Sequence, residues 1–276
     1  MALKNVALLV HSCDRYEFLF KGFEYFFSKY WDAQINCNCY FATEEIDPTI
    51  NHFTTIKSGK GAWADRLAVL LKEKIEEEYV LYFQEDMWLN KKVNAAFFNH
   101  LFEIVTDHNW QQVKLHSSDV YSTRKTNYFI EGFNIAEIDN AVSGFLMSHQ
   151  VTLWKKDFLV AQLYKDEHPW RNERRGTKRL KKLNPVIYHA DYFAENGQPA
   201  INQNENCTRS EYHTVSVNGM LGDTILPYIE KLQQAGEMEY AAALQLHYDH
   251  KLTHDGKPKP RKEDLFKKVK NFLRNR

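Results

Sequence analysis

The N-terminal third of the chain alternates short apolar runs with longer segments whose apolar residues recur at helical spacing. Four short apolar runs predict strands, at residues 5–11, 34–42, 52–56 and 79–83. Two intervening segments place their apolar residues on one helical face, at residues 16–31 and 63–78. Such an alternation of strands and helices is typical of a parallel sheet with helices on its faces.

The rest of the chain continues this pattern with shorter strand-like pieces. Apolar residues at helical spacing predict further helices, at residues 92–108, 155–164, 224–234 and 239–250. Short apolar pieces predict strands, at residues 112–116, 127–130, 144–147 and 186–188. We therefore expect an α/β fold, with a mostly parallel central sheet flanked by helices and a C-terminal helical extension.

The C-terminal residues differ in composition from the rest of the chain. Residues 254–260 contain Gly256, Pro258 and Pro260, which disfavour regular structure and predict a linker. Residues 261–276 carry seven Lys or Arg, and their apolar residues recur at helical spacing. This combination predicts a basic amphipathic helix that contacts an anionic membrane surface. The alternative is a terminal helix that docks on the domain through the same apolar stripe.

Composition and charge narrow the class of protein. The chain has 276 residues, which suit one large α/β domain. Lys and Arg total 36 and Asp and Glu total 36, so no net field attracts nucleic acid. No segment approaches the roughly 20 apolar residues that span a bilayer, and the N-terminus lacks a signal-peptide pattern, so we expect a cytoplasmic protein. The four cysteines lack the spacing of a zinc site, and we expect reduced thiols without a metal at Cys13, Cys37, Cys39 and Cys207.

The most informative stretch is the run from Tyr79 to Leu89. Its first five residues predict a buried strand, and Glu85 and Asp86 follow almost at once. Burying an unpaired carboxylate is costly, so this pair is expected to meet water, a cation or a ligand. In α/β proteins the carboxyl ends of parallel strands are where nucleotides and their metals bind. The alternative is a solvated turn after a strand.

Two other segments place polar residues near the same predicted sheet edge. Ser12, Asp14 and Arg15 follow the first strand, where Asp14 would accept hydrogen bonds from a base or ribose and Arg15 would meet a phosphate. The alternative is that Ser12 or Asp14 caps the next helix. In the first turn of the following helix, Asp65 suits the helix dipole. Arg66 does not, so it is expected to serve an anion or the carboxylate pair.

Residues 166–179 combine acidic and basic side chains. Pro169 favours a helix start, which places Glu173 about one turn inside the helix among many cations. The functional interpretation is a general base on the acceptor side of a site, with Arg and Lys neighbours that hold phosphates. The alternative is a solvated helix with paired surface charges. Further on, His189 and Asp191 follow an apolar strand and are candidates to complete a metal or diphosphate site.

These motifs, in this order, resemble those of GT-A type glycosyltransferases. The resemblance covers about residues 4–195 and rests on five segments, at residues 12–15, 61–67, 82–86, 150–155 and 169–173. The nearest look-alikes are bacterial or viral transferases that build surface polysaccharides. The resemblance implies a GT-A-like catalytic domain over residues 1–253, with a nucleotide-sugar-binding half at 1–90 and an acceptor-side half at 110–220.

The resemblance also implies a set of site residues. The donor, a nucleotide-diphosphate sugar, would contact Ser12, Asp14, Arg15, Thr43, Trp63, Asp65, Arg66, Glu85, Gln150 and Arg174. Asp86, together with His189, would hold Mn2+ or Mg2+. The family's Asp-x-Asp motif here reads Gln84-Glu85-Asp86, a departure that leaves strict metal dependence open. Glu173 matches the position of the catalytic base in inverting members.

The resulting hypothesis is an inverting hexosyl or deoxyhexosyl transfer to a hydroxyl of a glycan or a lipid-linked glycan. Glu173 would deprotonate the acceptor, while the metal at Asp86, with Arg66 or the Arg174–Arg175 pair, would stabilise the leaving diphosphate. A lipid-linked acceptor would bring the cytoplasmic protein to the inner face of a membrane. The alternatives are a metal-dependent phosphoesterase and a non-catalytic nucleotide-sugar-binding module.

Overall fold

The structure is a computed structural model that describes residues 5–202, 204 and 207–258. Contacts within the chain separate two units, residues 1–215 and 216–276, and each unit is described by itself. Every residue expected in the site belongs to the first unit.

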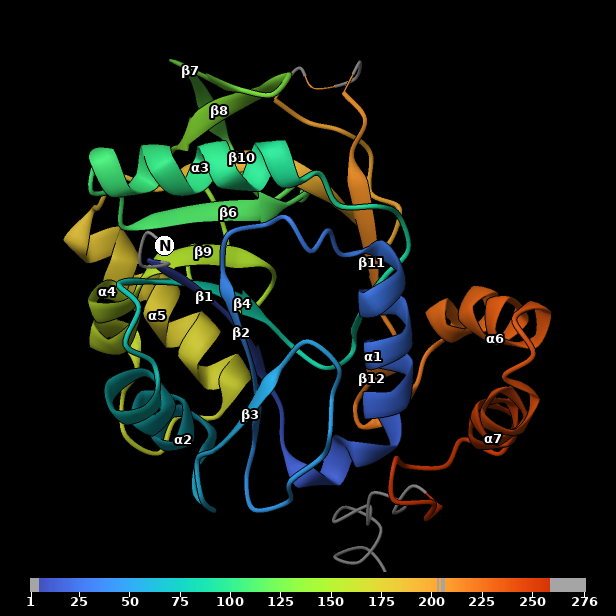
Figure 1. Ribbon diagram of the computed structural model, residues 1–276. Coiled ribbons are helices and arrows are strands. Elements are labelled where there is room, and N and C mark those ends of the chain that lie inside the picture. Colours follow the sequence, from blue (N-terminus) through green and yellow to red (C-terminus); the bar gives the residue numbers. More distant parts are fainter. Residues whose placement is uncertain (1–4, 203, 205–206, 259–276) are drawn as a thin grey trace, which may run out of the picture. The chain divides into compact units, whose positions relative to one another are not determined.

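A mixed sheet of 11 strands forms the centre of the first unit (Figure 1). Nine strands follow in the order β3 (Thr54–Lys57), β2 (Asn38–Thr43), β1 (Val6–His11), β4 (Tyr79–Phe83), β9 (Thr152–Lys155), β6 (Gln112–His116), β10 (Tyr188–Glu195), β11 (Ser210–Thr214) and β5 (Met87–Leu89). β8 (Phe133–Ile138) pairs with β10, and β7 (Thr123–Ile130) pairs with β8. Pairing is parallel from β3 to β4 and from β6 to β11, and β9 runs antiparallel between these groups. The expected α/β class, with a mostly parallel central sheet flanked by helices, is confirmed.

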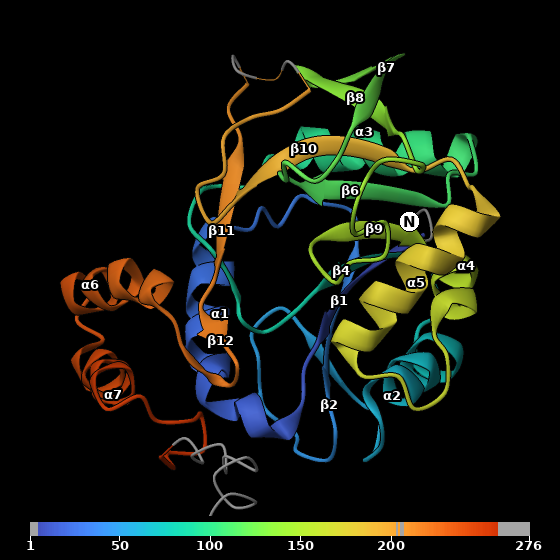
Figure 2. The same cartoon turned by 180° about the vertical axis from the view of Figure 1, so that it is seen from behind.

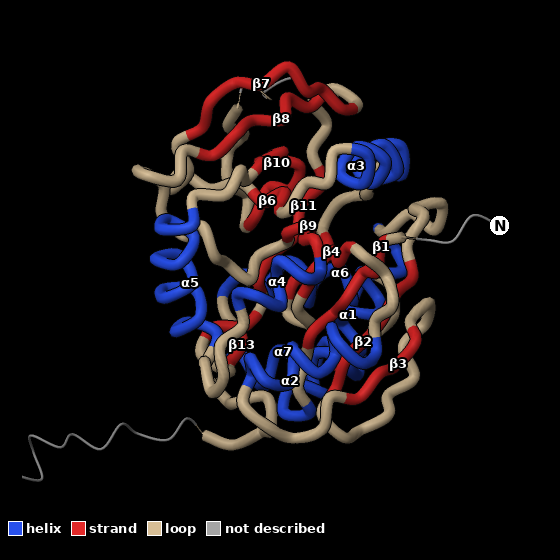
Figure 3. Tube along the Cα trace, turned by 90° about the vertical axis from the view of Figure 1, so that its left-hand side faces the viewer, coloured by secondary structure: helices blue, strands red, loops and turns tan. Residues whose placement is uncertain are grey.

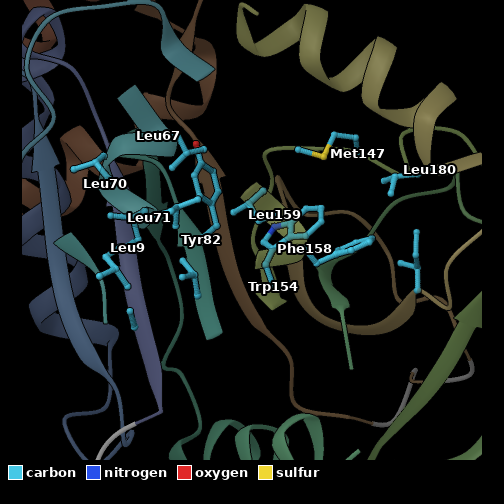
Figure 4. Packing of buried hydrophobic residues seen from close by; sticks show 14 of the residues in the cluster. Leu9, Leu67, Leu70, Leu71, Tyr82, Met147, Trp154, Phe158, Leu159 and Leu180 are labelled. Carbon is cyan, nitrogen blue, oxygen red and sulfur yellow. The ribbon is translucent and has the colours of Figure 1, made fainter. Parts of the chain in front are cut away.

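Both faces of the sheet are covered by helices (Figure 2), which is why β1 and β4 appear in the sequence as unbroken apolar runs. One face packs against residues of α2 (Trp63–Val69), α4 (Lys156–Gln162) and α5 (Pro169–Leu183), and its strand residues include Ala7, Leu9, Val80 and Tyr82 (Figure 4). On the other face, Phe41 meets Phe20 of α1 (Glu17–Tyr30). Phe98 of α3 (Ala95–Asp107) meets Phe193 of β10 on that face.

Two expected elements differ from the structure. The helix predicted over residues 63–78 ends earlier, because α2 continues only as a π-helical turn, Leu70–Lys74, and Ile75 is already extended. The strand predicted over residues 144–147 is wrong. Side chains bond its backbone instead: Gln112 Nε2 donates to the Leu146 carbonyl at 3.0 Å, and the Met147 N–H donates to Thr177 Oγ1 at 3.2 Å. Leu146 and Met147 are buried, but their backbone groups bond side chains of β6 and α5 in place of a strand partner.

The second unit is mostly helical over its described residues. It contains β12 (Ser216–Val217), β13 (Met220–Leu221), η3 (Asp223–Ile225), α6 (Leu226–Gln234) and α7 (Met238–Asp249). The helices expected near residues 224–234 and 239–250 are therefore present. Within the expected linker, His254 is buried and its Nε2 lies 2.8 Å from Ser216 Oγ. The expected basic helix at 261–276 lies outside the described residues, and the boundaries proposed for it remain predictions.

The described residues include no helix that combines the length and the apolar character needed to cross a bilayer. The longest helix in the described part of the chain, α5, is 15 residues long and rich in Lys and Arg.

Replacing Gly22 with Ala should destabilise the first unit. A Cβ at this position of α1 would overlap the indole of Trp88, which is fully buried under the helix. We expect the free energy of unfolding to fall by about 1–3 kcal/mol, although Ala is a better helix former than Gly. The measurement is the midpoint of urea unfolding. Gly144→Ala is the control, because its Cβ would meet Val120 at an ordinary 3.6 Å. An unchanged midpoint for Gly22→Ala would mean that α1 can move away from the indole.

Candidate active site

The carboxyl ends of five parallel strands meet at one edge of the sheet. Backbone bonds tie their exits together: the Ser12 N–H donates to the Ala42 carbonyl at 3.0 Å, and the Ser117 N–H donates to the Phe193 carbonyl at 2.9 Å. The Glu195 N–H then donates to Ser117 Oγ at 3.2 Å. Polar side chains that follow β1, β2, β4, β6 and β10 are therefore brought to the same edge. This is the place where open α/β sheets bind ligands.

Glu85 and Asp86 occupy the tight turn between β4 and β5. The turn is closed by the Met87 N–H, which donates to the Gln84 carbonyl at 3.1 Å. Glu85 is buried, and burial together with the neighbouring Asp86 raises its pKa well above the ordinary value. Burial raises the pKa of Asp86 to about 7. The sequence-based expectation that this carboxylate pair sits at a strand end matches the geometry.

Two further carboxylates approach this pair from other elements. Glu173 lies on the inner side of α5, where its Oε1 accepts from the His149 N–H at 2.9 Å. Burial raises the pKa of Glu173, and the His149 N–H and the nearby Lys114 charge oppose that shift. Glu195 ends β10, and its pKa is raised to about 7 by burial and then by the charges of Glu173 and Asp86. The charges of Glu173 on α5 and of Asp86 in the β4–β5 turn thus both act on Glu195 at the end of β10.

Lys114 is a site residue that sequence reasoning missed. It lies fully buried on β6, donates to Ser148 Oγ at 2.9 Å and stands 5.3 Å from the ring centre of Tyr121. Burial lowers its pKa to about 7, while Glu173 and Glu195 oppose the shift. A signal was present, because Gln112, Lys114 and His116 alternate along one strand and so share one face. Glu195 left no such signal; only the fold brings it to the edge.

Arg66 and Trp63 enter from the first turn of α2. Arg66 is buried, donates from Nη1 to the Ser12 carbonyl at 3.2 Å and lies 3.6 Å from Glu44 Oε1. Its Nε is also buried and has no hydrogen-bond partner among the described residues. The Trp63 ring lies against His149, with ring centres 4.3 Å apart. Arg66 thus places a cation at the strand-end loops, and its expected role toward an anion or the carboxylate pair remains a prediction.

Four other residues that were expected to contact the donor substrate form hydrogen bonds within the protein, and these bonds tie the loops of this edge together. The Asp14 carboxylate accepts from the N–H groups of Glu44 at 2.8 Å and Glu45 at 3.0 Å. Thr43, which is buried, donates to the Ile46 carbonyl at 2.7 Å. Asp65 Oδ2 accepts from the Asp166 N–H at 3.2 Å, and Gln150 Oε1 accepts from the Tyr212 hydroxyl at 2.8 Å. These contacts shape the backbone around the site, and the expected donor contacts of the four residues remain predictions.

The remaining expected residues lie in different surroundings. Arg15 and Arg174 are exposed. His189 is fully buried; its Nε2 lies 2.8 Å from the His116 carbonyl and its Nδ1 lies 2.6 Å from Asn202 Nδ2. Both ring nitrogens of His189 therefore already have partners. The sequence-based pairing of His189 with Asp86 at a metal has no contact in the structure to support it.

A divalent cation at this edge would have to complete its coordination with non-protein oxygens. Among the described residues, no group of three or more His, Cys, Asp or Glu side chains is arranged to hold a metal ion. The raised pKa values of Glu85 and Asp86 nonetheless mark two carboxylates that lack a full counter-charge. Two carboxylates plus diphosphate and water oxygens are a usual environment for Mg2+. The pair therefore fits a cation that arrives with a diphosphate.

Replacing Glu195 with Gln should stabilise the protein at pH 8 and leave stability at pH 4 nearly unchanged. Folding raises the pKa of Glu195 from about 4.5 to about 7. The contribution of Glu195 to folding stability is therefore complete at a pH below its unfolded-state pKa, and it is lost as the pH rises through its folded-state pKa. Gln mimics the protonated acid, so we expect a gain on the order of 1–3 kcal/mol at pH 8. The measurement is the free energy of unfolding in urea at pH 4 and at pH 8. Glu103→Gln is the control, because Glu103 is exposed. Equal shifts at pH 4 and pH 8 would contradict it.

Comparisons with known proteins add structural likenesses at low identity. No family model matches the sequence, and no curated protein sequence matches it. Among solved structures, S. aureus TarS 1–349 is similar with a TM-score of 0.47 and 10% identity, over 89% of this chain and 70% of that one. A longer S. aureus TarS structure has a TM-score of 0.47 and 12% identity, over 88% of this chain and 43% of that one. S. aureus TarS 1–349 in complex with UDP has a TM-score of 0.48 and 12% identity, over 87% and 70%.

Proposed function

We propose that the protein transfers a sugar, with inversion, from a nucleotide-diphosphate donor to a hydroxyl of a glycan or a lipid-linked glycan. The observation that carries the proposal is the placement of three carboxylates at the carboxyl edge of the parallel strands. Asp86 follows β4, Glu195 ends β10, and Glu173 is bonded by the N–H of His149, which lies just before β9. Buried Arg66 stands at the same strand ends. A transfer reaction of this kind requires a cation near its anionic leaving group and a carboxylate that accepts the proton of its nucleophile.

On the donor side, Asp86 and Arg66 are the residues expected to meet the diphosphate. Asp86, with Glu85 beside it, would hold Mn2+ or Mg2+, which when bound supplies positive charge to the departing nucleoside diphosphate. Arg66 brings a fixed positive charge to the Ser12 turn, and its buried Nε–H has no hydrogen-bond partner among the residues that the structure describes. The Trp63 ring next to His149 gives this end of the site an aromatic wall.

On the acceptor side, Glu173 is the residue that we assign as general base. The His149 N–H fixes one carboxylate oxygen at 2.9 Å and leaves the other to accept a proton from the acceptor hydroxyl. Burial brings the pKa of Glu173 up toward the working range of a base, and the His149 N–H and the Lys114 charge oppose that shift. Glu173 comes from α5 and the expected diphosphate site from the β4–β5 turn, so base and leaving group belong to different elements, as an in-line displacement with inversion requires.

A panel of nucleotide-diphosphate sugars, each with and without a glycan acceptor, tests the proposal. Release of nucleoside diphosphate that depends on the acceptor is the expected result. Release of inorganic phosphate would favour a metal-dependent phosphoesterase instead. A thermal shift without any release would favour a nucleotide-sugar-binding module, since a bound ligand stabilises the folded state by mass action. Repeating the assay with EDTA measures how far the reaction depends on a divalent metal.

A further inference from the structure

Helix α5 carries a row of cations on the side that faces away from the sheet. Six Lys and Arg residues are exposed at a spacing of three and four residues, and they are Arg171, Arg174, Arg175, Lys178, Lys181 and Lys182. The buried residues of the same helix are Asn172, Gly176 and Leu180, on the opposite side. Figure 3 shows α5 running along the side of the strands. We call these six exposed residues the α5 ridge.

Most of the ridge has no neutralising partner in the described part of the chain. Arg175 lies 3.9 Å from Glu167, and Lys181 donates to the Ala141 carbonyl at 3.0 Å. The other four form no ion pair with the described residues. Lys181 and Lys182 lie in the last turn, where cations suit the helix dipole. The remaining four residues of the ridge lie earlier in the helix, where like charges three and four residues apart repel one another, so helix stability does not explain them. In a chain with 36 cationic and 36 anionic residues, so local an excess indicates an anionic partner.

Apolar side chains are exposed at the C-terminal end of the ridge. Leu183 is 60% exposed, Val186 is 50% exposed and Val142 is 68% exposed. The loop that carries Val142 is fastened to this end of α5, because Asn140 Nδ2 donates to Asn184 Oδ1 at 3.1 Å. Cations beside exposed apolar side chains are typical of a surface that lies on a membrane, where the head groups meet the cations and the apolar residues enter the interface. A soluble polyanion would use the cations alone.

We infer that the α5 ridge, together with Val142, Leu183 and Val186, binds the surface of an anionic phospholipid membrane. This contact belongs to the first unit and does not require the basic segment predicted at residues 261–276. It also does not require the proposed reaction. If the reaction is the proposed one, Glu173 on the inner side of the same helix would lie next to a membrane that presents lipid-linked acceptors.

The test is co-sedimentation of the full chain with phosphatidylglycerol vesicles and with phosphatidylcholine vesicles. The variant Arg171→Gln/Lys178→Gln/Lys182→Gln should lower the partition onto phosphatidylglycerol by about tenfold or more, and wild-type binding should weaken as salt is added. The matched control is Lys72→Gln/Lys74→Gln/Lys125→Gln, which removes the same charge from exposed positions elsewhere. The control should bind as the wild type does.

A second variant separates a membrane from a soluble polyanion. Val142→Ser/Leu183→Ser/Val186→Ser keeps every cation, and it should still lose vesicle binding by several-fold while binding to heparin stays unchanged. Equal loss in the ridge variant and its charge-matched control would overturn the inference, as would wild-type vesicle binding by the ridge variant. If the serine variant binds vesicles like the wild type, the partner of the ridge is a soluble polyanion and the membrane assignment is wrong.

Discussion

Asp86→Asn is expected to reduce sugar transfer by on the order of 100- to 1,000-fold, because it removes the carboxylate charge that would hold the divalent cation of the diphosphate. The substitution keeps the size and shape of the side chain, removes its negative charge and replaces one carboxylate oxygen with an NH2 group. Folding raises the pKa of Asp86 to about 7, so the ionised form destabilises the folded state at pH 8. The variant should therefore melt at a higher temperature than the wild type at pH 8 while it loses activity.

The measurements are acceptor-dependent release of nucleoside diphosphate and the thermal midpoint at pH 8. Asp107→Asn is the control, because Asp107 is exposed at the end of α3. It should change neither quantity. Activity of Asp86→Asn within about threefold of wild type, on the order of 0.7 kcal/mol in barrier, would remove Asp86 from the site. Lower stability together with lower activity would instead indicate a structural role.

The sequence was most informative where burial is complete on both sides of an element. All residues of β1 and β4 are buried, so each appears as an unbroken apolar run, and the polar residues that end the run stand out. This is why Glu85 and Asp86 were found at the correct edge. The start of α5 was also predictable, because Pro169 occupies its first turn.

The sequence was least informative where polar groups are buried through partners far along the chain. β10 contains His189 and Asp191, which are buried because Asn202 bonds the first and Arg209 pairs with the second at 2.7 Å. No local pattern predicts such partners, so only the start of this strand was anticipated. Glu195 ends the same strand and was missed for the same reason. Its role depends on Glu173 and Asp86, which belong to other elements.

Helical phase explains which residues of the 166–179 segment point into the site. Glu173 follows Asn172, the first buried residue of the inner side. Gly176 lets α5 approach the side chain of Met147, which a Cβ at this position would overlap. Arg174 is exposed, so its expected contact with the donor would need a ligand that extends out of the site. The helical period therefore turns Glu173 toward the site and Arg174 toward solvent, although the two residues are adjacent in the sequence.

Glu173→Gln should remove turnover by roughly 100- to 10,000-fold and leave donor affinity nearly intact, because loss of a general base affects the acceptor step alone. The amide can still accept from the His149 N–H, so the local structure should persist. The activity of the wild type should fall as the pH is lowered through the raised pKa of Glu173, because the base is then protonated. The measurements are turnover, donor binding by thermal shift, and the pH profile of the wild type.

Glu167→Gln is the matched control on the same segment. Glu167 is buried and bonds Arg179 at 3.0 Å and Asn172 at 2.7 Å, so this change should lower stability and spare turnover per folded molecule. If Glu173→Gln loses donor binding, Glu173 has a structural or nucleotide role. If Glu173→Gln stays active while Glu167→Gln loses turnover, the base is Glu167. Only selective loss of turnover in Glu173→Gln, with donor binding retained, agrees with a carboxylate that acts on the acceptor hydroxyl.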